Sequence, residues 1–263
     1  MQMKKQKKPY GLKAPFLKKI SVQSDKVKNW NEYPFSISLF NNKKFSIDIQ
    51  NPVTIIVGDN GSGKSTLLEA IAGHCGFSLS GGSRNHTTHE FKQEDEKLSE
   101  FLRFAWLPKI GKGYFFRAET FLGFVNGLDD LSKDPMIGQL AFDGVGGKSL
   151  RERSHGESFI EIFKNQFGQR GIYILDEPES ALSPQRQTEL LKLVHELGQS
   201  GDCQFIIATH SPLLMAIPNA DLRFIEGGEL VKRDFHETDH FKMMRDFYLY
   251  PDGFVSGLLM DNN

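Results

Sequence analysis

Gly58–Ser65 read GDNGSGKS and lie between an apolar run, Val53–Val57, and a segment with apolar residues at helical spacing, Thr66–Ala72. This order predicts a buried strand, a glycine loop and a helix. Glycines let backbone N–H groups turn inward around a phosphate, and a helix N-terminus carries partial positive charge. The stretch therefore predicts a P-loop that binds a nucleoside triphosphate.

The residues of this loop have distinct expected roles. We expect Lys64 to reach the β- and γ-phosphates and the Ser65 hydroxyl to ligate Mg²⁺. The residues expected along the phosphates are Asn60, Gly61, Ser62, Gly63, Lys64, Ser65 and Thr66. A tight turn whose glycines serve only packing is the alternative, and the flanking strand and helix argue against it. ATP with Mg²⁺ is therefore the expected ligand.

Length and charge indicate an ordinary globular protein. The chain has 263 residues, of which 39% are hydrophobic and 25% charged, and its formal net charge is -1. These values fit one α/β domain with a sizeable core, and they give no overall attraction to nucleic acid or an anionic membrane. Lysines crowd residues 4–19. We expect this stretch to be a solvated terminus, with a nucleic-acid contact as the alternative.

Targeting patterns are absent from the sequence. No apolar run approaches the length of a membrane span, and no apolar core follows the basic N-terminus as it would in a signal peptide. Cys75 and Cys203 are too few for a disulfide framework. We therefore expect a cytoplasmic protein with no direct membrane insertion.

The segments before the P-loop predict a small antiparallel sheet. Its expected strands are Phe16–Val22, Phe35–Phe40 and Phe45–Ile49. A sheet in this position is suited to hold the adenine base, with Tyr33 or Phe35 stacked on it. The alternative is that these aromatic side chains belong to the core.

The middle of the chain predicts an insertion and a helical lobe. Residues 77–99 are polar and glycine-rich, as in a surface insertion. Phe101–Leu107 is expected to be a helix end, and Gly113–Phe116 a strand. Residues 120–168 are expected to form the lobe, in which Ser154–Ser158, read SHGES, precede an amphipathic helix. This pentapeptide suits a second anion-binding cradle, with a simple N-cap as the alternative.

Two apolar runs in the second half end in polar residues. Ile172–Leu175 run into Asp176 and Glu177, and Phe205–Ala208 are followed closely by His210. Open α/β sheets place their chemistry at the carboxyl ends of parallel strands. We expect Asp176 to hold Mg²⁺ through water, Glu177 to polarise the attacking water and His210 to sense the γ-phosphate. An acidic turn and a satisfied core histidine are the alternatives.

The remaining segments complete the expected layout. Ser183 is expected to cap a helix that Gly198 ends. Phe224 and Ile225 predict a short strand, and Phe241–Tyr250 a packed helix without a catalytic pattern.

In this order the motifs resemble those of the ABC-type ATPases. The matching segments are Gly58–Ser65 for Walker A, Ser154–Ser158 for the signature motif, Ile172–Glu177 for Walker B with its catalytic glutamate, Ser180–Ser183 for the D-loop and His210 for the switch histidine. Together they are far more specific than any one motif. The SHGES signature, the segment Phe116–Glu119 and the short lobe resemble more narrowly the small stand-alone bacterial ATPases called AAA-type, on the SMC and RecF side of the superfamily.

The chain departs from the pattern of this family in two places. Arg117, Ala118 and Glu119 stand where a Q-loop glutamine would follow the strand, so Glu119 is the candidate for the Mg²⁺ or water role. The signature also lacks the LSGGQ form of transporters. This second departure argues against a transporter.

The resemblance implies a fold and a mechanism. The expected fold is a single P-loop α/β domain over residues 1–263, with an ABC-ATPase-like mixed sheet, a flanking antiparallel β-subdomain and a small helical lobe. A homodimer would sandwich ATP head to tail, with Ser154, Gly156 and Glu157 of one chain facing the γ-phosphate held by Lys64 of the other. Lys64, Glu177 and His210 are the implied catalytic residues.

Three functions compete at this point. The first is a soluble ATP-driven switch whose dimerisation acts on an unidentified protein partner, in a process such as DNA maintenance or anti-phage defence. The second is the nucleotide-binding subunit of a membrane ABC transporter, which a membrane partner would favour. The third is an ATP-dependent nucleic-acid-binding module, which salt-dependent DNA binding through the basic N-terminus would favour.

Overall fold

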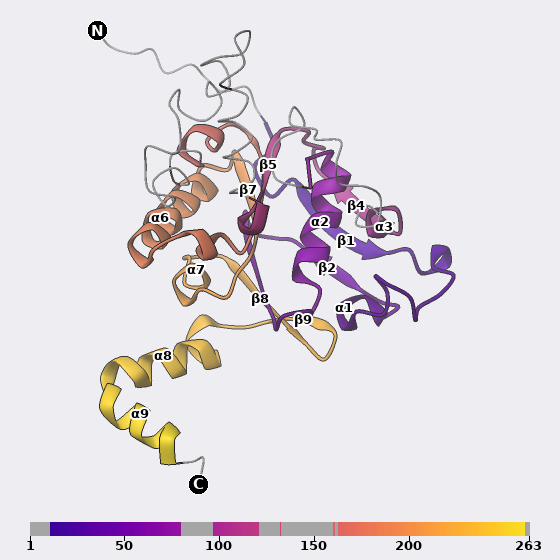
Figure 1. The fold of residues 1–263 in the computed structure, drawn as a ribbon. Helices are drawn as coiled ribbons and strands as arrows, with labels where there is room; N and C mark the ends of the chain where they lie inside the picture. The colour runs from indigo at the N-terminus through magenta and orange to yellow at the C-terminus, as the bar shows by residue number, and fades with distance from the viewer. Residues whose placement is uncertain (1–10, 80–96, 121–131, 133–159, 161–162, 261–263) are drawn as a thin grey trace, which may run out of the picture.

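The computed structural model describes residues 11–79, 97–120, 132, 160 and 163–260. A six-stranded sheet forms its centre (Figure 1). The strand order is β5-β6-β7-β3-β8-β9. The bounds are β3 Val53–Val57, β5 Gly113–Arg117, β6 Gly171–Asp176, β7 Cys203–Ala208, β8 Asp221–Glu226 and β9 Glu229–Lys232. Neighbouring strands run parallel except β8 and β9, which are antiparallel. The predicted mixed α/β sheet is confirmed.

Both faces of this sheet are covered, which explains the continuous apolar runs of its central strands. Ile55 faces a core shared with the helix α6, Pro184–Ser200. Ile56 faces a second core shared with the P-loop helix α2, Lys64–Cys75. In Figure 1, α6 and α2 lie on opposite sides of the sheet. The alternation along one strand therefore builds a layered domain.

The predicted antiparallel sheet is present, although its strands differ from those expected. It has the order β2-β1-β4, with β1 Leu17–Val22, β2 Ser46–Asp48 and β4 Leu102–Trp106, and both pairings are antiparallel. The prediction of a helix end at Phe101–Leu107 was wrong. Burial of β4 alternates along the strand, because one of its faces packs on the core and the other meets solvent.

The strand predicted at Phe35–Phe40 was also wrong, because residues Ser38–Asn41 form a short helix, α1. Leu39 and Phe40 are consecutive and both fully buried, so the segment does not show the alternation expected of a half-buried strand. Phe35 is buried in edge-to-face contact with Trp30 and Phe101, at centroid distances of 5.3 and 5.2 Å. Phe35 thus belongs to the core and is not available to stack on a base.

α6 ends later than predicted, for a packing reason. The helix continues to Ser200, and Gly201 in the left-handed conformation (φ 76°) follows it. Gly198, the expected end, lies inside the helix, where a Cβ would come 2.9 Å from Cγ2 of Val53. This glycine therefore permits close approach of α6 to the sheet.

The described chain also contains the α-helices α3 Lys97–Glu100, α7 Pro212–Met215, α8 Asp239–Leu249 and α9 Pro251–Met260. The helix predicted at Phe241–Tyr250 is confirmed as α8. Its predicted packing is present only at its start, where Phe241 contacts Phe235, and no residue of α8 or α9 is fully buried. Figure 1 shows both helices extending away from the sheets. Within the described residues, no helix has the length and apolar character needed to cross a bilayer.

The buried Gln204 on β7 joins the two sheets. Its Oε1 accepts hydrogen bonds from the backbone N–H groups of Phe16 (2.7 Å) and Leu17 (2.9 Å), and its Nε2 donates to the carbonyl of Leu17 (3.0 Å). The Gln204 side chain has no exposed area. One amide therefore satisfies three backbone groups at the start of β1 that water does not reach.

We expect Gln204→Leu to lower the free energy of unfolding by about 3 kcal/mol, because it leaves buried backbone groups without partners. Urea unfolding measures this change. Gln185→Leu on the exposed side of α6 is the matched control, with an expected change within about 0.5 kcal/mol. Equal urea midpoints for the two variants would contradict the bridging role of Gln204.

Candidate active site

The P-loop runs from the end of β3 to the first residue of α2. Gly61 (φ 77°) and Gly63 (φ 107°) take left-handed conformations that favour glycine. A Cβ at Gly63 would also lie 2.9 Å from Cγ2 of Ile37, so the loop passes close to the segment before α1. The sequence thus fixes a narrow turn that presents backbone N–H groups at the N-terminus of α2.

Lys64 is almost fully buried at the start of α2. Its Nζ donates hydrogen bonds to the carbonyl oxygens of Gly58 (2.6 Å) and Asp59 (3.1 Å). Burial lowers the pKa of Lys64, and the negative charges of Glu177 and Asp176 oppose that shift. The ammonium group is therefore held against the loop by neutral acceptors that an anion can replace.

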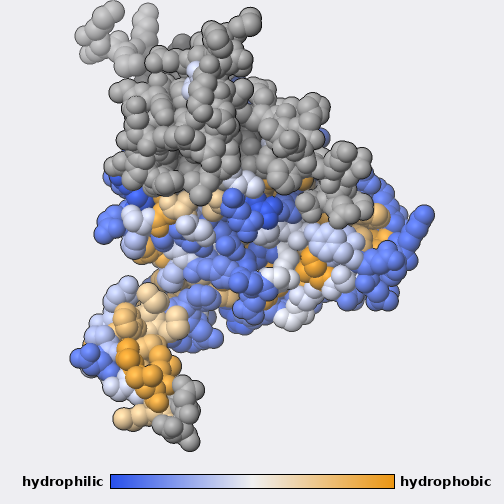
Figure 2. Space-filling view, viewed as in Figure 1, coloured by the Kyte–Doolittle hydropathy of each residue, from blue (hydrophilic) through white to orange (hydrophobic). Residues whose placement is uncertain are grey.

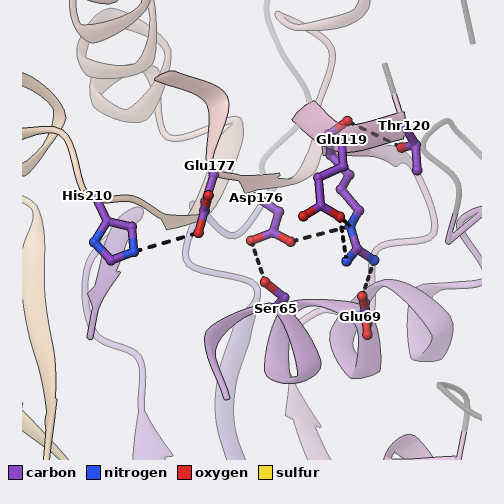
Figure 3. A network of polar contacts seen from close by, with 8 residues as sticks. Ser65, Glu69, Glu119, Thr120, Asp176, Glu177 and His210 are labelled. Atoms are coloured by element: carbon purple, nitrogen blue, oxygen red, sulfur yellow. Dashed lines mark hydrogen bonds and ion pairs between the residues drawn. The ribbon is translucent and has the colours of Figure 1, made fainter. Parts of the chain in front are cut away.

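Asp176 lies at the carboxyl end of β6, beside the P-loop helix. The Ser65 hydroxyl donates a hydrogen bond of 3.2 Å to Oδ1 of Asp176, which is 3% exposed (Figure 3). Burial raises the pKa of Asp176 to about 6, while the Ser65 hydrogen bond and the Arg117 charge oppose the rise. A hydroxyl and a carboxylate side by side are oxygen donors of the kind that Mg²⁺ prefers, so this pair fits that ion.

Glu177 and His210 face each other across the ends of β6 and β7. The distance between Oε1 of Glu177 and Nε2 of His210 is 3.7 Å (Figure 3). Glu177 has a left-handed backbone (φ 47°), a strained conformation that is common at functional sites. Among the described residues, Nε2 of His210 has no hydrogen-bond partner although the atom is buried. The geometry leaves a carboxylate and an imidazole open to a ligand beside Asp176.

Arg117 carries a polar network that the sequence did not predict. It ends β5 opposite Asp176, and its Nε lies 3.9 Å from Oδ2 of that residue. Its guanidinium also pairs with the buried Glu69 of α2 and, at 3.1 Å, with Glu119 (Figure 3). The sequence signal for Glu69 was that it is a charged residue within the apolar stretch of α2.

The described residues place the other predicted positions as follows. Glu119 is 78% exposed and contacts Arg117, and no contact joins it to Ser65 or Asp176 in the described chain. Asn60 and Gly61 form the exposed tip of the loop, and Thr66 lies half-buried in the first turn of α2. The Oγ atom of Ser62 is buried and has no hydrogen-bond partner among the described residues.

The signature residues Ser154, Gly156 and Glu157 lie outside the described residues, as do most of the predicted helical lobe and of the insertion at 77–99.

A cavity of 440 Å³ adjoins the P-loop on the side of β8. It is lined by Gly58, Asp59, His210, Arg233, Thr238 and His240, among others. The site thus opens toward the start of α8.

Comparisons with known proteins agree with this geometry. Residues 26–208 match the family model AAA_23, described as an AAA domain. The "Probable ATP-dependent transporter ycf16" of Cyanidium caldarium is 25% identical over 204 residues, which are 69% of this chain and 79% of the relative. The "Thiamine import ATP-binding protein ThiQ" of Chelativorans sp. is 28% identical over 190 residues, which are 68% and 74% of the two chains.

Two further matches come from other kinds of protein. The "OLD nuclease" of Thermus scotoductus is 26% identical over 213 residues, which are 71% of this chain but 38% of the nuclease. A solved SMC head bound to the C-winged helix domain of ScpA has a TM-score of 0.49 and 17% identity, and covers 84% of this chain and 98% of its own. Because the family model matches more than half of the chain, this protein belongs to the AAA domain family. Together with the ATP-binding relatives, this match identifies the protein as an ABC-type ATPase, which binds and hydrolyses ATP.

Proposed function

We propose that the P-loop and the polar ends of β6 and β7 form the site of ATP hydrolysis. The observation that carries this proposal is the 3.2 Å contact between Ser65 Oγ and Asp176 Oδ1, with the buried Lys64 immediately before Ser65 at the start of α2. This arrangement puts a cation, a hydroxyl and a carboxylate at one helix N-terminus. A triphosphate with its divalent ion requires these groups together.

Each residue then has a distinct task. Lys64 exchanges the carbonyl oxygens of Gly58 and Asp59 for phosphate oxygens, and Ser65 with Asp176 holds Mg²⁺. When bound, Mg²⁺ neutralises charge on the phosphates. Glu177 accepts the proton of the water that attacks the γ-phosphorus, while the bond to the bridging oxygen breaks and releases ADP. His210, whose Nε2 has no hydrogen-bond partner in the described chain, donates to the departing phosphoryl group.

We further propose that the site is completed by a second copy of the chain. Glu177 and His210 are 38% and 37% exposed, so the γ-phosphate side of the site is open in the single chain. In the proposed head-to-tail dimer, Ser154, Gly156 and Glu157 of one chain cap the nucleotide held by the other. Excluding water from this face strengthens every charge contact inside it.

The proposed biological role is that of a switch that acts on a protein partner, in a process such as DNA maintenance or anti-phage defence. The match to a relative named OLD nuclease supports this direction. The names of several relatives, which are import ATP-binding proteins, favour a second candidate, the nucleotide-binding subunit of a transporter. Co-purification of the chain with a membrane protein would favour the transporter subunit, and co-purification with a soluble protein would favour the switch.

Lys64→Ala removes the cation from the P-loop and is expected to weaken ATP binding at least about 100-fold, because charge-assisted hydrogen bonds to the phosphates are lost. Equilibrium binding of a fluorescent ATP analogue measures this change. Lys192→Ala on the exposed side of α6 is the control and should bind like wild type. Tight binding by the Lys64 variant would remove this residue from the site.

Glu177→Gln keeps the shape of the side chain but cannot accept a proton, so the hydrolysis rate should fall roughly 100- to 10,000-fold with ATP affinity unchanged. Unhydrolysed ATP should then stay trapped in the closed dimer and resist a chase with unlabelled ATP. The double variant with Ser154→Arg should bind ATP but release it quickly. A wild-type hydrolysis rate for Glu177→Gln would exclude Glu177 as the base. If the double variant retained ATP as long as Glu177→Gln alone, the head-to-tail dimer would be excluded.

Glu119 is proposed to serve Mg²⁺ or the attacking water in place of a Q-loop glutamine. Glu119→Ala should lower the hydrolysis rate by about tenfold or more without changing ATP affinity, because residues around a metal site contribute on this scale. Glu119→Gln retains an oxygen ligand and should restore most of the rate. Steady-state kinetics separate the two variants, and wild-type rates for Glu119→Ala would show that Glu119 only pairs with Arg117.

A further inference from the structure

The helices α8 and α9 form an arm, residues 239–260, that contacts the rest of the described chain at its start, where His240 and Phe241 pack on Phe224 and Phe235. No residue in either helix is buried. The large apolar side chains that are about half to three-quarters exposed include Met243, Tyr248, Leu249, Tyr250, Val255, Leu259 and Met260. In Figure 2 the arm shows a continuous hydrophobic surface below the body of the molecule. Such a patch marks an interaction surface.

The arm has little to stabilise it alone. Helices of 11 and 10 residues are marginal in water, and most helical stability in proteins comes from packing of an apolar face. The rings of Phe247 and Phe254, 5.7 Å apart, join α8 to α9, and this contact leaves the outer apolar residues exposed. A covering surface outside this pair of helices is therefore needed.

The described body of the same chain offers no surface of this kind. Its exposed large apolar residues are Leu12, Tyr33, Leu107 and Leu213, and each comes from a different segment. Isolated apolar residues are normal on any protein surface. Among the described residues the arm is the only broad apolar surface, so the same surface on a second copy would match it in size and character.

The charges of the arm favour the same occupant. Lys242 lies 3.8 Å from Asp239, and Arg245 lies 2.7 Å from Asp246, so these cations have acidic neighbours within α8. Asp252 adds an acidic residue in α9. A helix that binds an anionic lipid surface needs an excess of Lys and Arg on its polar face, which the arm lacks.

We propose that the α8–α9 arm pairs with the same arm of a second copy, and that this contact forms without nucleotide. Two helices from each chain make a four-helix arrangement, and the same residues meet on both sides. Seven such side chains provide roughly 100–150 Å² each, or about 700–1,000 Å² per chain, whereas a standard interface needs about 800 Å² per partner.

The position of the arm connects this contact to the ATPase. Thr238 and His240, where the arm begins, line the cavity that also contains Gly58, Asp59 and His210. Arms that hold two chains together raise the local concentration of one nucleotide site around the other, so ATP closes a dimer that already exists. This consequence depends on the proposed ATP sandwich, while the arm contact itself does not.

The experiment measures the mass of the full-length protein without nucleotide by sedimentation at micromolar concentration. Wild type should be a dimer, and the double variant Leu249→Asp, Leu259→Asp should have half that mass. ATP affinity of the double variant should change by less than about twofold, which shows that the body is folded. Leu107→Asp, at an equally exposed leucine of the body, is the control and should remain a dimer.

A monomeric wild type, or a double variant that stays dimeric, would overturn the arm contact. Wild type that is monomeric but floats with phosphatidylserine vesicles would overturn it in favour of a membrane surface. ATP retention by Glu177→Gln tests the sandwich separately. A nucleotide-free dimer without ATP retention keeps the arm contact and rejects the sandwich, and a monomer with ATP retention does the reverse.

Discussion

Burial of the Asp176 carboxylate is the constraint on which the rest of the site depends. β6 lies between β5 and β7, so the residue at its end is enclosed on both sides and is 3% exposed. An isolated carboxylate in such a place is costly. The fold offsets this cost with Ser65, which donates from α2, and with Arg117, which ends the neighbouring strand. The P-loop helix and the sheet are therefore held in one relative position by the group that the chemistry also needs.

Arg117 and Glu69 show where sequence reasoning reached its limit. Glycine spacing between an apolar run and a helix predicts the P-loop, because the glycines act locally. Pairing of Glu69 with Arg117 joins α2 to β5 across 48 positions, and no local pattern encodes it. Glu69 was visible only as a charge among apolar neighbours. The network of Arg117 with Glu69, Glu119 and Asp176 thus became clear only when the structure brought the elements together.

In the fold, too, local sequence patterns predict some elements, and tertiary contacts determine the others. The strands β3, β6 and β7 were predicted well, because strands buried on both faces are apolar throughout. Phe35–Phe40 alternates as a strand does, yet the local burial of Leu39 and Phe40 gives a helical turn. Gly198 has the appearance of a helix end but serves close packing on Val53. Gln204 sits unmarked within a buried strand, although it joins two sheets. Each of these errors arose where tertiary contact overrode a local preference.

The tail is the complementary case, because a packed helix was predicted there and the structure leaves most of its apolar residues exposed. The apolar residues of α6 and α8 have similar patterns in the sequence. Helical periodicity indicates that one face of a helix is apolar, but it does not indicate which chain packs on that face. In α6 the sheet covers that face. In α8 the described chain covers the first residues and leaves the later apolar ones exposed, and the helix begins beside the open side of the nucleotide site. One chain thus leaves two surfaces uncovered next to each other, the γ-phosphate side of the nucleotide site and the apolar arm. The proposed ATP sandwich would cover the first with a second copy, and the proposed arm contact would cover the second.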